Sequence, residues 1–411
     1  MTSLSTLWLL VRRSLARHAV STVVTIASAA TASGLVISVF ALGEQSRKAF
    51  SGGEVGFDAV LGAKGSELQL VLNAVFHLET SPGNLPWHLY QEAAAASGVS
   101  RAIPYAVGDS FERFRVVGTT KARFDDLALA NGGRAFDEHH REAVIGATVA
   151  ASTGLTVGAS FRPVHGLEAN EEHSHDEEYA VTGILRSTGA PIDRVIFIPI
   201  EGVFRLGGHV LRGGGEEFHA HAHEEIPDEH KEVSAVLLTL DSPQAGFALR
   251  QRLDDQGADA TLAFPIGQSI AELFDKLGFV NRILELVAWL VMVVAAGSIL
   301  AAITNTMNER RREFAVLRAL GARRTTVFSA IVLEATTIAA AGAALGLVVY
   351  VGISWVVGGL VQTRTGVVLE LVTDHSALVF TPLAMIALGA AAGLVPALLA
   401  YRTEVVASLA E

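Results

Sequence analysis

Four long apolar runs without a charged residue constrain this chain more than any other feature. They occupy residues Ala19–Leu42, Leu286–Asn308, Ala335–Val361 and Ala377–Tyr401. Each is longer than the about 20 residues that an α-helix needs to cross a bilayer. The chain is 50% hydrophobic, yet 18% of its residues are charged, which is too many for a protein made of spans alone. The sequence therefore predicts a few transmembrane helices and a large water-exposed domain.

The charge of the connecting segments orients these spans. Residues 1–18 contain Arg12, Arg13 and Arg17 and no acidic residue, and residues 309–324 contain six arginines and two glutamates. Basic segments stay on the cytoplasmic side of a membrane. The alternative for the first run is a cleavable signal peptide, but such peptides have only roughly 7–15 apolar residues. We therefore expect both termini and residues 309–324 in the cytoplasm.

These rules predict the following order of segments: a cytoplasmic segment 1–18, span 19–42, an external domain 43–285, span 286–308, a cytoplasmic helix 309–324, span 325–361, a short external loop 362–376, span 377–401 and a cytoplasmic tail 402–411.

The external region is acidic, and its sequence contains both strand-like and helix-like hydrophobic patterns. Residues 44–277 carry 19 basic and 34 acidic residues, and this charge excludes nucleic acid as a partner because phosphate binding needs a basic face. Strands are predicted at Phe111–Thr119, Tyr179–Leu185, Val195–Ile200 and Val233–Leu240. Helices are predicted at His88–Ser97, Ala245–Leu253 and Ser269–Leu277, the last separated from the second span only by Gly278. We expect an α+β domain.

Between the second and third spans lies the most distinctive stretch, which runs from Glu309 to Arg324 and reads ERRREFAVLRALGARR. At 3.6 residues per turn its apolar side chains share one side and its arginines project elsewhere. Gly321 stands where a helix C-cap favours glycine. The pattern predicts a short amphipathic helix at the membrane surface. The alternative is a basic loop that only fixes the topology.

This stretch resembles the cytoplasmic coupling segment of MacB/FtsX-type (type VII) ABC-transporter permeases, whose pattern is close to E-R-x-R-E-[IF]-x-x-[LR]-R-A-L-G-A. In that family the segment docks on a separate ATPase subunit. The resemblance assigns the ATPase contact to Glu309, Arg310, Arg311, Arg312, Glu313, Phe314, Leu317, Arg318, Leu320 and Gly321.

Three other stretches resemble the same family. Residues 62–72 (GAKGSELQLVL) resemble its G-A-K-G-S-P-L-Q-L-V-L start, with Glu67 in place of the proline. Residues 143–158 resemble its strand and turn V-I-G…A…G-L…V-G-D, with Ala159 in place of the aspartate. Residues 393–409 resemble its closing pattern G-x-x-P-A-x-x-A-x-R. The resemblance thus extends over the whole chain.

The resemblance implies a permease subunit of the bacterial inner membrane, working as a homodimer with two ATPases that bind ATP and Mg²⁺. It implies that ATPase closure moves the spans and the external domain, for export or extraction of a lipoprotein, peptide or drug, with a periplasmic adaptor or an outer-membrane protein as a further partner. The alternatives are a scaffold that regulates a cell-wall hydrolase and a zinc-linked envelope protein.

Catalytic motifs are missing from the sequence. There is no phosphate-binding G-x-x-x-x-G-K-[ST], no G-x-S-x-G and no H-E-x-x-H. The absence of cysteine excludes disulfides, thiolate metal sites and cysteine nucleophiles. We expect no enzyme activity and no cofactor on this chain, and ATP hydrolysis on a partner.

Small residues within the spans predict how the helices pack. Gly342 and Gly346, and likewise Gly389 and Gly393, lie four residues apart and so share one helix face. We expect packing within the chain, with a dimer face as the alternative. Glu334 is the one acidic residue near the start of the third span, where it is either at the interface or buried.

Histidines are concentrated in two acidic stretches of the external region. The candidate zinc ligands are His173, His175 and Asp176 in one stretch, and His219, His221, His223 and His230 in the other. Alternate histidines converge on one side of an extended strand and suit zinc, as carboxylates do. Three alternatives remain: regulatory or adventitious zinc binding, a dedicated transport site, and polar low-complexity loops without a metal.

Overall fold

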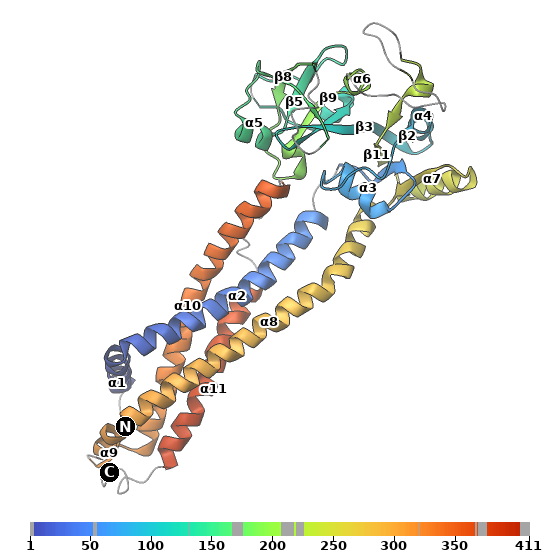
Figure 1. Ribbon diagram of the computed structural model, residues 1–411. Helices are drawn as coiled ribbons and strands as arrows, with labels where there is room; N and C mark the ends of the chain where they lie inside the picture. The colour runs from blue at the N-terminus through green and yellow to red at the C-terminus, as the bar shows by residue number, and fades with distance from the viewer. Residues whose placement is uncertain are drawn as a thin grey trace. The chain divides into compact units, whose positions relative to one another are not determined.

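The computed structural model describes residues 4–51, 56–130, 132–166, 176–206, 218, 226–319, 321–365, 368 and 376–402 (Figure 1). The chain divides into two compact units. The helical unit consists of Met1–Arg47, Leu277–Gly359 and Leu369–Glu411, and the domain unit consists of Lys48–Lys276 and Leu360–Val368. Each unit is described by itself.

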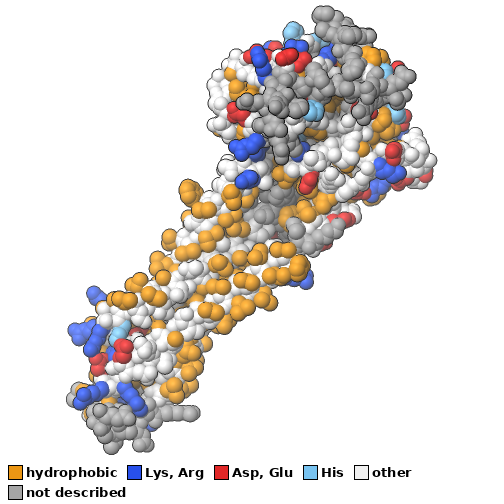
Figure 2. Space-filling view, in the orientation of Figure 1, with side chains coloured by type: hydrophobic (Ala, Val, Ile, Leu, Met, Phe, Trp, Pro, Cys, Tyr) orange, Lys and Arg blue, Asp and Glu red, His pale blue; other side chains and the backbone are white. Residues whose placement is uncertain are grey.

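Six long or amphipathic helices belong wholly or partly to the helical unit: α1 (Leu4–Arg17), α2 (Ala19–Ser51), α8 (Ile266–Glu309), α9 (Arg311–Ala319), α10 (Arg324–Thr365) and α11 (Ser376–Arg402). Four of them contain segments long and apolar enough to cross a membrane: Ala19–Gln45, Gly278–Glu309, Arg324–Thr365 and Ser376–Tyr401. Apolar side chains cover the face of the bundle that Figure 2 shows. Val293, Trp355 and Leu383 are among the large apolar residues of the spans that are exposed. The predicted four-span architecture is confirmed.

The spans approach one another closely where glycines face alanines. A Cβ atom added at Gly342 of α10 would lie 2.4 Å from Cβ of Ala29 of α2, and one added at Gly389 of α11 would lie 2.2 Å from Cβ of Ala339 of α10. Gly346 lies in the same way against Ser33, and Gly393 against Ala335. Without a hydrophobic force in lipid, such close van der Waals contact holds helices together. All four glycines therefore pack inside the chain.

Two helices extend further than the sequence suggested. α8 continues through Gly278 without a break, so the predicted helix before the second span and the span itself are one helix. A glycine costs only about 1 kcal/mol in a helix, and the apolar residues on both sides outweigh it. α10 begins within one residue of the predicted span 325–361 and continues past its predicted end to Thr365, and Glu334 is an interior residue of that helix.

A large sheet forms the centre of the domain unit. Its strands are β1 (Ala59–Ala63), β3 (Val99–Phe111), β4 (Phe114–Thr119), β5 (Glu142–Ile145), β6 (Ser160–Phe161), β7 (Val164–His165), β8 (Tyr179–Ile184), β9 (Val195–Pro199), β11 (Ala235–Leu240) and β12 (Ala260–Ala263). Their order is β12-β1-β11-β3-β4-β9-β5-β8-β6, with β7 beside β3. The pairs β4–β9 and β5–β8 are parallel and the others antiparallel. β2 (Leu85–Pro86) and β10 (Glu232–Val233) form a separate pair.

Short helices surround this sheet: α3 (Glu67–Ala74), α4 (Trp87–Ala94), α5 (Ala147–Thr153), α6 (Ile200–Phe204) and α7 (Pro243–Asp255). Successive strand residues point to opposite faces. Val116 and Ile196 belong to one apolar cluster, while their neighbours Val117 and Phe197 belong to the other. The sheet is thus buried on both faces, and the domain is a mixed α and β fold, as predicted.

Four predicted strands and two predicted helices coincide with observed elements. The predicted strands correspond to β4, β8, β9 and the pair β10 and β11, and the helices to α4 and α7. Two long or central elements were not predicted: β1, whose short run AVLGA is buried throughout, and most of β3.

Candidate functional site

Helix α9 lies between α8 and α10, and the residues at its C-terminal end explain why it stops there. Its last turn closes with the N–H of Ala322 donating to the carbonyl of Leu317 at 3.0 Å and that of Gly321 to Arg318 at 3.1 Å. Gly321 has φ +97°, a conformation that glycine adopts readily and other residues avoid. The sequence ALGA thus ends the helix and turns the chain toward α10.

One face of α9 packs on the bundle and another is exposed. Ala315 is buried, and Phe314 contacts the apolar cluster of the spans. Arg312, Val316 and Ala319 are exposed and follow one another at helical spacing. We call these three residues the α9 face. It combines a cation with an apolar side chain that is 46% exposed at Val316.

Arg310, just before α9, points inward and joins three helices. Its guanidinium donates to Oγ of Ser14 in α1 at 2.6 Å and lies 3.6 Å from the carboxylate of Glu334 in α10. The Ser14 hydroxyl donates in turn to Glu334 at 2.6 Å. Both charged side chains are about one-tenth exposed, 11% for Arg310 and 10% for Glu334. The hydroxyl thus completes a buried ion pair.

Glu313 connects this pair to the surface. Arg310 Nε donates to Glu313 at 3.1 Å, and Arg17 of α1 makes a short ion pair with the same carboxylate. Partial burial opposes the charge on Glu313, but the hydrogen bonds and charges of Arg310 and Arg17 outweigh it and lower the pKa of Glu313 below 4.5. We call Ser14, Arg17, Arg310, Glu313 and Glu334 the Arg310 network.

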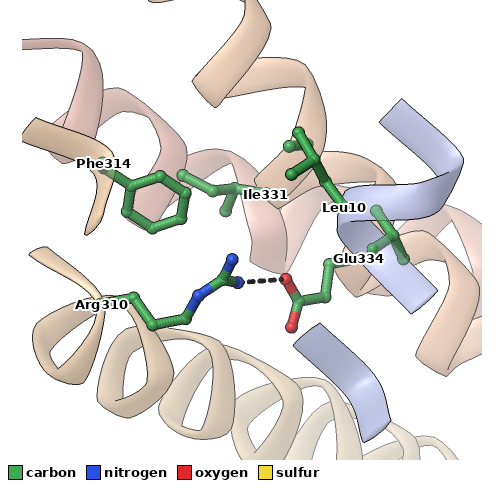
Figure 3. A pocket seen from close by; sticks show the side chains of 7 residues that line it. Leu10, Arg310, Phe314, Ile331 and Glu334 are labelled. Atoms are coloured by element: carbon green, nitrogen blue, oxygen red, sulfur yellow. Dashed lines mark ion pairs between the residues drawn. The ribbon is translucent and has the colours of Figure 1, made fainter. Parts of the chain in front are cut away.

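A small cavity lies beside the Arg310 network. Figure 3 shows the guanidinium of Arg310 directed at Glu334, with Phe314, Ile331 and Leu10 around them. The guanidinium also lies over the Phe314 ring, 4.8 Å from its centre. The cavity has space for about one water molecule. Because its other walls are apolar, the two charges depend on each other and on Ser14.

The predicted ATPase-contact residues therefore occupy different environments. Arg311 and Arg312 are exposed, whereas Leu317 and Arg318 are half-buried. Glu309 is exposed and lies 3.2 Å from Nδ1 of His18. Leu320 lies outside the described residues. Their contact with an ATPase stays a prediction for every member of the set.

The candidate zinc ligands are mostly beyond the described residues. His173, His175, His219, His221 and His223 all lie there. Asp176 is exposed. His230 is largely buried and stacks on Phe218, with 4.7 Å between ring centres. Where the structure describes the chain, it places no three His, Cys, Asp or Glu residues together as metal ligands. Zinc binding stays a prediction.

Sequence reasoning missed Ser14 and Val316. Ser14 is a hydroxyl on the buried side of the amphipathic helix α1, near Val11, and a polar residue at such a position signals a polar partner. That partner is 320 residues away, so its identity needed the structure. Val316 is a large apolar residue on the exposed side of α9, where it lies between Arg312 and Ala319.

Four spans, a large mixed domain between the first two and an amphipathic helix between the next two define a multi-pass membrane protein. Two family models match: the FtsX-like permease C-terminal region over residues 285–405, and the MacB-like periplasmic core domain over residues 22–256. The chain belongs to the MacB/FtsX family of ABC-transporter permeases.

Solved structures with similarity include two extracytoplasmic domains. The periplasmic region of MacB from Actinobacillus actinomycetemcomitans is 12% identical, with TM-score 0.35, covering 54% of this chain and 96% of that one. The extracellular domain of the noncanonic ABC-type transporter YknZ from Gram-positive bacteria is 15% identical, with TM-score 0.31, covering 49% and 97%. A comparison with curated proteins found no matching sequence.

Proposed function

We propose that this permease subunit takes up the motion of a separate ATPase through α9 and passes it to its external domain. The observation that carries the proposal is the α9 face, a cation and an exposed valine on a helix whose opposite side packs on the spans through Phe314 and Ala315. An exposed apolar side chain beside a charge suits a protein partner with an apolar groove and an acidic rim. ATP and Mg²⁺ bind on that partner.

The Arg310 network supports the transmission step. Arg310 directly precedes α9, and its guanidinium contacts Ser14 of α1 and Glu334 of α10. A displacement of α9 therefore pulls on α10, which contains a span, and on α1, which directly precedes the first span, through buried polar contacts. These contacts resist stretching because a buried charge that loses its partner is costly. In this proposal Arg310 acts between α9 and the spans, and the α9 face contacts the ATPase.

The topology and the partners form part of the same proposal. The basic segments place both termini and α9 in the cytoplasm and the domain unit outside. Two copies of the chain work with two ATPases, in lipid and with an adaptor or outer-membrane partner, to export or extract an envelope substrate such as a lipoprotein, a peptide or a drug. Regulation of a cell-wall hydrolase would use the same motion.

Co-purification of the full chain from native membranes tests this function. We expect an ABC ATPase to accompany the unmodified chain. Arg312→Glu combined with Val316→Asp should weaken its retention about thirtyfold or more, because the loss of even one central residue of a protein interface costs about 2 kcal/mol or more.

The matched control is Arg13→Glu, a charge reversal at an exposed arginine of α1 that lies outside the α9 face. It should retain the ATPase. Recovery of no ATPase with the unmodified chain would contradict the proposed function. Full retention by the double variant would contradict the assignment of the α9 face.

A further inference from the structure

The end of α10 that lies farthest from α9 is held by the external domain. Thr363, in the last turn of α10, belongs to the domain unit together with the turn between β8 and β9. Arg194 of that turn donates from Nη1 to the carbonyl of Thr363. After the helix ends, the N–H of Val368 donates to the carbonyl of Gly189 at 3.0 Å. Two separate hydrogen bonds thus connect residues far apart in the sequence.

The chemistry of this contact fits a helix C-terminus. The last four carbonyls of a helix have no partner within the helix and carry partial negative charge. A guanidinium both donates to such a carbonyl and complements that charge. Arg194 is also placed by the ring of Phe114, 5.0 Å below its central carbon. Its approach to α10 is therefore fixed from two sides.

A buried carboxylate holds the turn ready for this contact. Asp193 is 1% exposed and accepts hydrogen bonds from Ser187, Thr188 and Gly189, at 2.9 to 3.0 Å. Gly189 adopts φ +68°, and its carbonyl is the one that receives the N–H of Val368. The neighbouring Asp193 and Arg194 thus serve two purposes: the first shapes the turn and the second holds α10. We call Ser187–Arg194 the α10 clasp.

We propose that the α10 clasp is the point at which displacement of α10 is passed to the external domain, with Arg194 and Asp193 as positioning residues. α2 and α8 are joined to the domain by the chain itself, whereas α10 is followed by a separate span and needs a noncovalent connection to move the domain. α10 is also the helix that begins just after α9 and carries Glu334. This inference rests on the proposed function and adds the contact that completes it.

The charges around Arg194 make the contact adjustable. Burial lowers the pKa of Arg194, and the nearby cations Arg113 and Arg364 lower it further. Arg194 therefore meets the helix end against repulsion from two other cations, and the acceptor of its hydrogen bond to α10 is the neutral carbonyl oxygen of Thr363. The α10 clasp is consequently the weaker of the two polar connections of α10, and a single substitution should open it.

Spin labels on α10 and on the domain test the inference in the full complex in lipid nanodiscs. The chain has no cysteine, so Trp355→Cys, 77% exposed on α10, and Phe247→Cys, 57% exposed on α7, give one defined pair. With Arg194 present, we expect one narrow distribution of the distance between the two labels. This distribution should be the same whether or not ATP is trapped on the ATPase. In Arg194→Ala the narrow distribution should be lost, and its mean should shift when ATP is trapped.

Two variants and one further measurement distinguish loss of the α10 clasp from a general loss of structure. Arg186→Ala removes an exposed arginine from the same segment between β8 and β9. It should leave the narrow distance distribution unchanged. Arg194→Lys keeps a cation that can donate to Thr363 and should restore it. Hydrogen exchange of the Val368 amide should accelerate in Arg194→Ala, while exchange at Ile196 in the buried strand β9 stays slow.

A narrow, nucleotide-independent distribution in Arg194→Ala, or unchanged exchange at Val368, would overturn the inference. The ATPase should co-purify with Arg194→Ala as with the unmodified chain. The spin-label and exchange results with a retained ATPase therefore test only this inference. Absence of the ATPase from the unmodified chain would instead contradict the proposed function.

Discussion

The two ends of α10 are held by polar contacts of different kinds. About three turns in from its start, Glu334 pairs in a buried setting with the charged Arg310 and accepts a hydrogen bond from the neutral hydroxyl of Ser14. At its other end, a half-buried arginine meets a neutral backbone carbonyl. A buried charge that loses its partner has no water to replace it, while water can reach a half-buried arginine and replace a lost acceptor. The first contact therefore behaves as a permanent joint and the second as one that can open.

The largest expected effect is at the permanent joint. Glu334→Ala removes the buried counter-charge of Arg310 and leaves it the partly exposed Glu313, so we expect a loss of about 3 kcal/mol, the low end of the cost when a buried pair loses one member. Thermal or denaturant unfolding of the purified full chain measures this. Glu272→Ala, at an exposed glutamate of α8, serves as the control and should stay within about 0.5 kcal/mol. Equal stability of the two variants would contradict the claim that the contact at Glu334 is the stronger of the two contacts of α10.

A smaller effect is expected within the α10 clasp. Asp193→Ala removes the buried carboxylate that orders the turn and takes the acceptor from the partly buried hydrogen bonds of Ser187, Thr188 and Gly189, at a cost of about 1–2 kcal/mol. Arg194→Ala should cost less than about 1 kcal/mol because water can satisfy the exposed helix end. The free energies of unfolding of both variants show which substitution costs more, and Asp241→Ala, at an exposed aspartate, serves as the control. A larger loss for Arg194→Ala than for Asp193→Ala would reverse the roles assigned to them.

The smallest effect concerns pH and Glu313. Because Arg310 and Arg17 lower the pKa of Glu313 in the folded chain, its contribution to stability is present above its ordinary value of 4.5. That contribution is lost as the pH falls through the lowered pKa. Glu313→Gln should therefore show a shallower loss of stability than the unmodified chain on acidification from roughly pH 6 to pH 3. Parallel curves would show that Glu313 adds nothing to the joint.

How much could be predicted from the sequence differed between the two units. Uncharged runs identified all four spans, since bilayer thickness imposes a length that composition reveals. Strands rich in Val, Ile and Phe, such as β9, were also recognisable. β1 was not, because its five residues are small and buried on both faces and so carry no alternation. Pattern arguments work where one physical constraint dominates a whole segment.

The contacts at the candidate site were less accessible to prediction. The sequence placed arginines and an amphipathic helix between two spans, but could not tell which arginine would turn inward. Arg310 does so because Ser14 and Glu334 supply partners from helices remote in the chain. Arg194 likewise meets Thr363 across 169 positions. Long-range polar pairs leave no periodic trace, and a lone Ser14 on an apolar face is the only local sign.

The central claim is that α9 faces the cytoplasm, where an ATPase can reach it. Labelling a single cysteine in spheroplasts tests this, and the chain has none of its own. Arg312→Cys should react with a membrane-permeant maleimide and resist an impermeant one, while Asp259→Cys, at a domain side chain that is 89% exposed, should react with both. Reaction of Arg312→Cys with the impermeant reagent in intact spheroplasts would contradict the account.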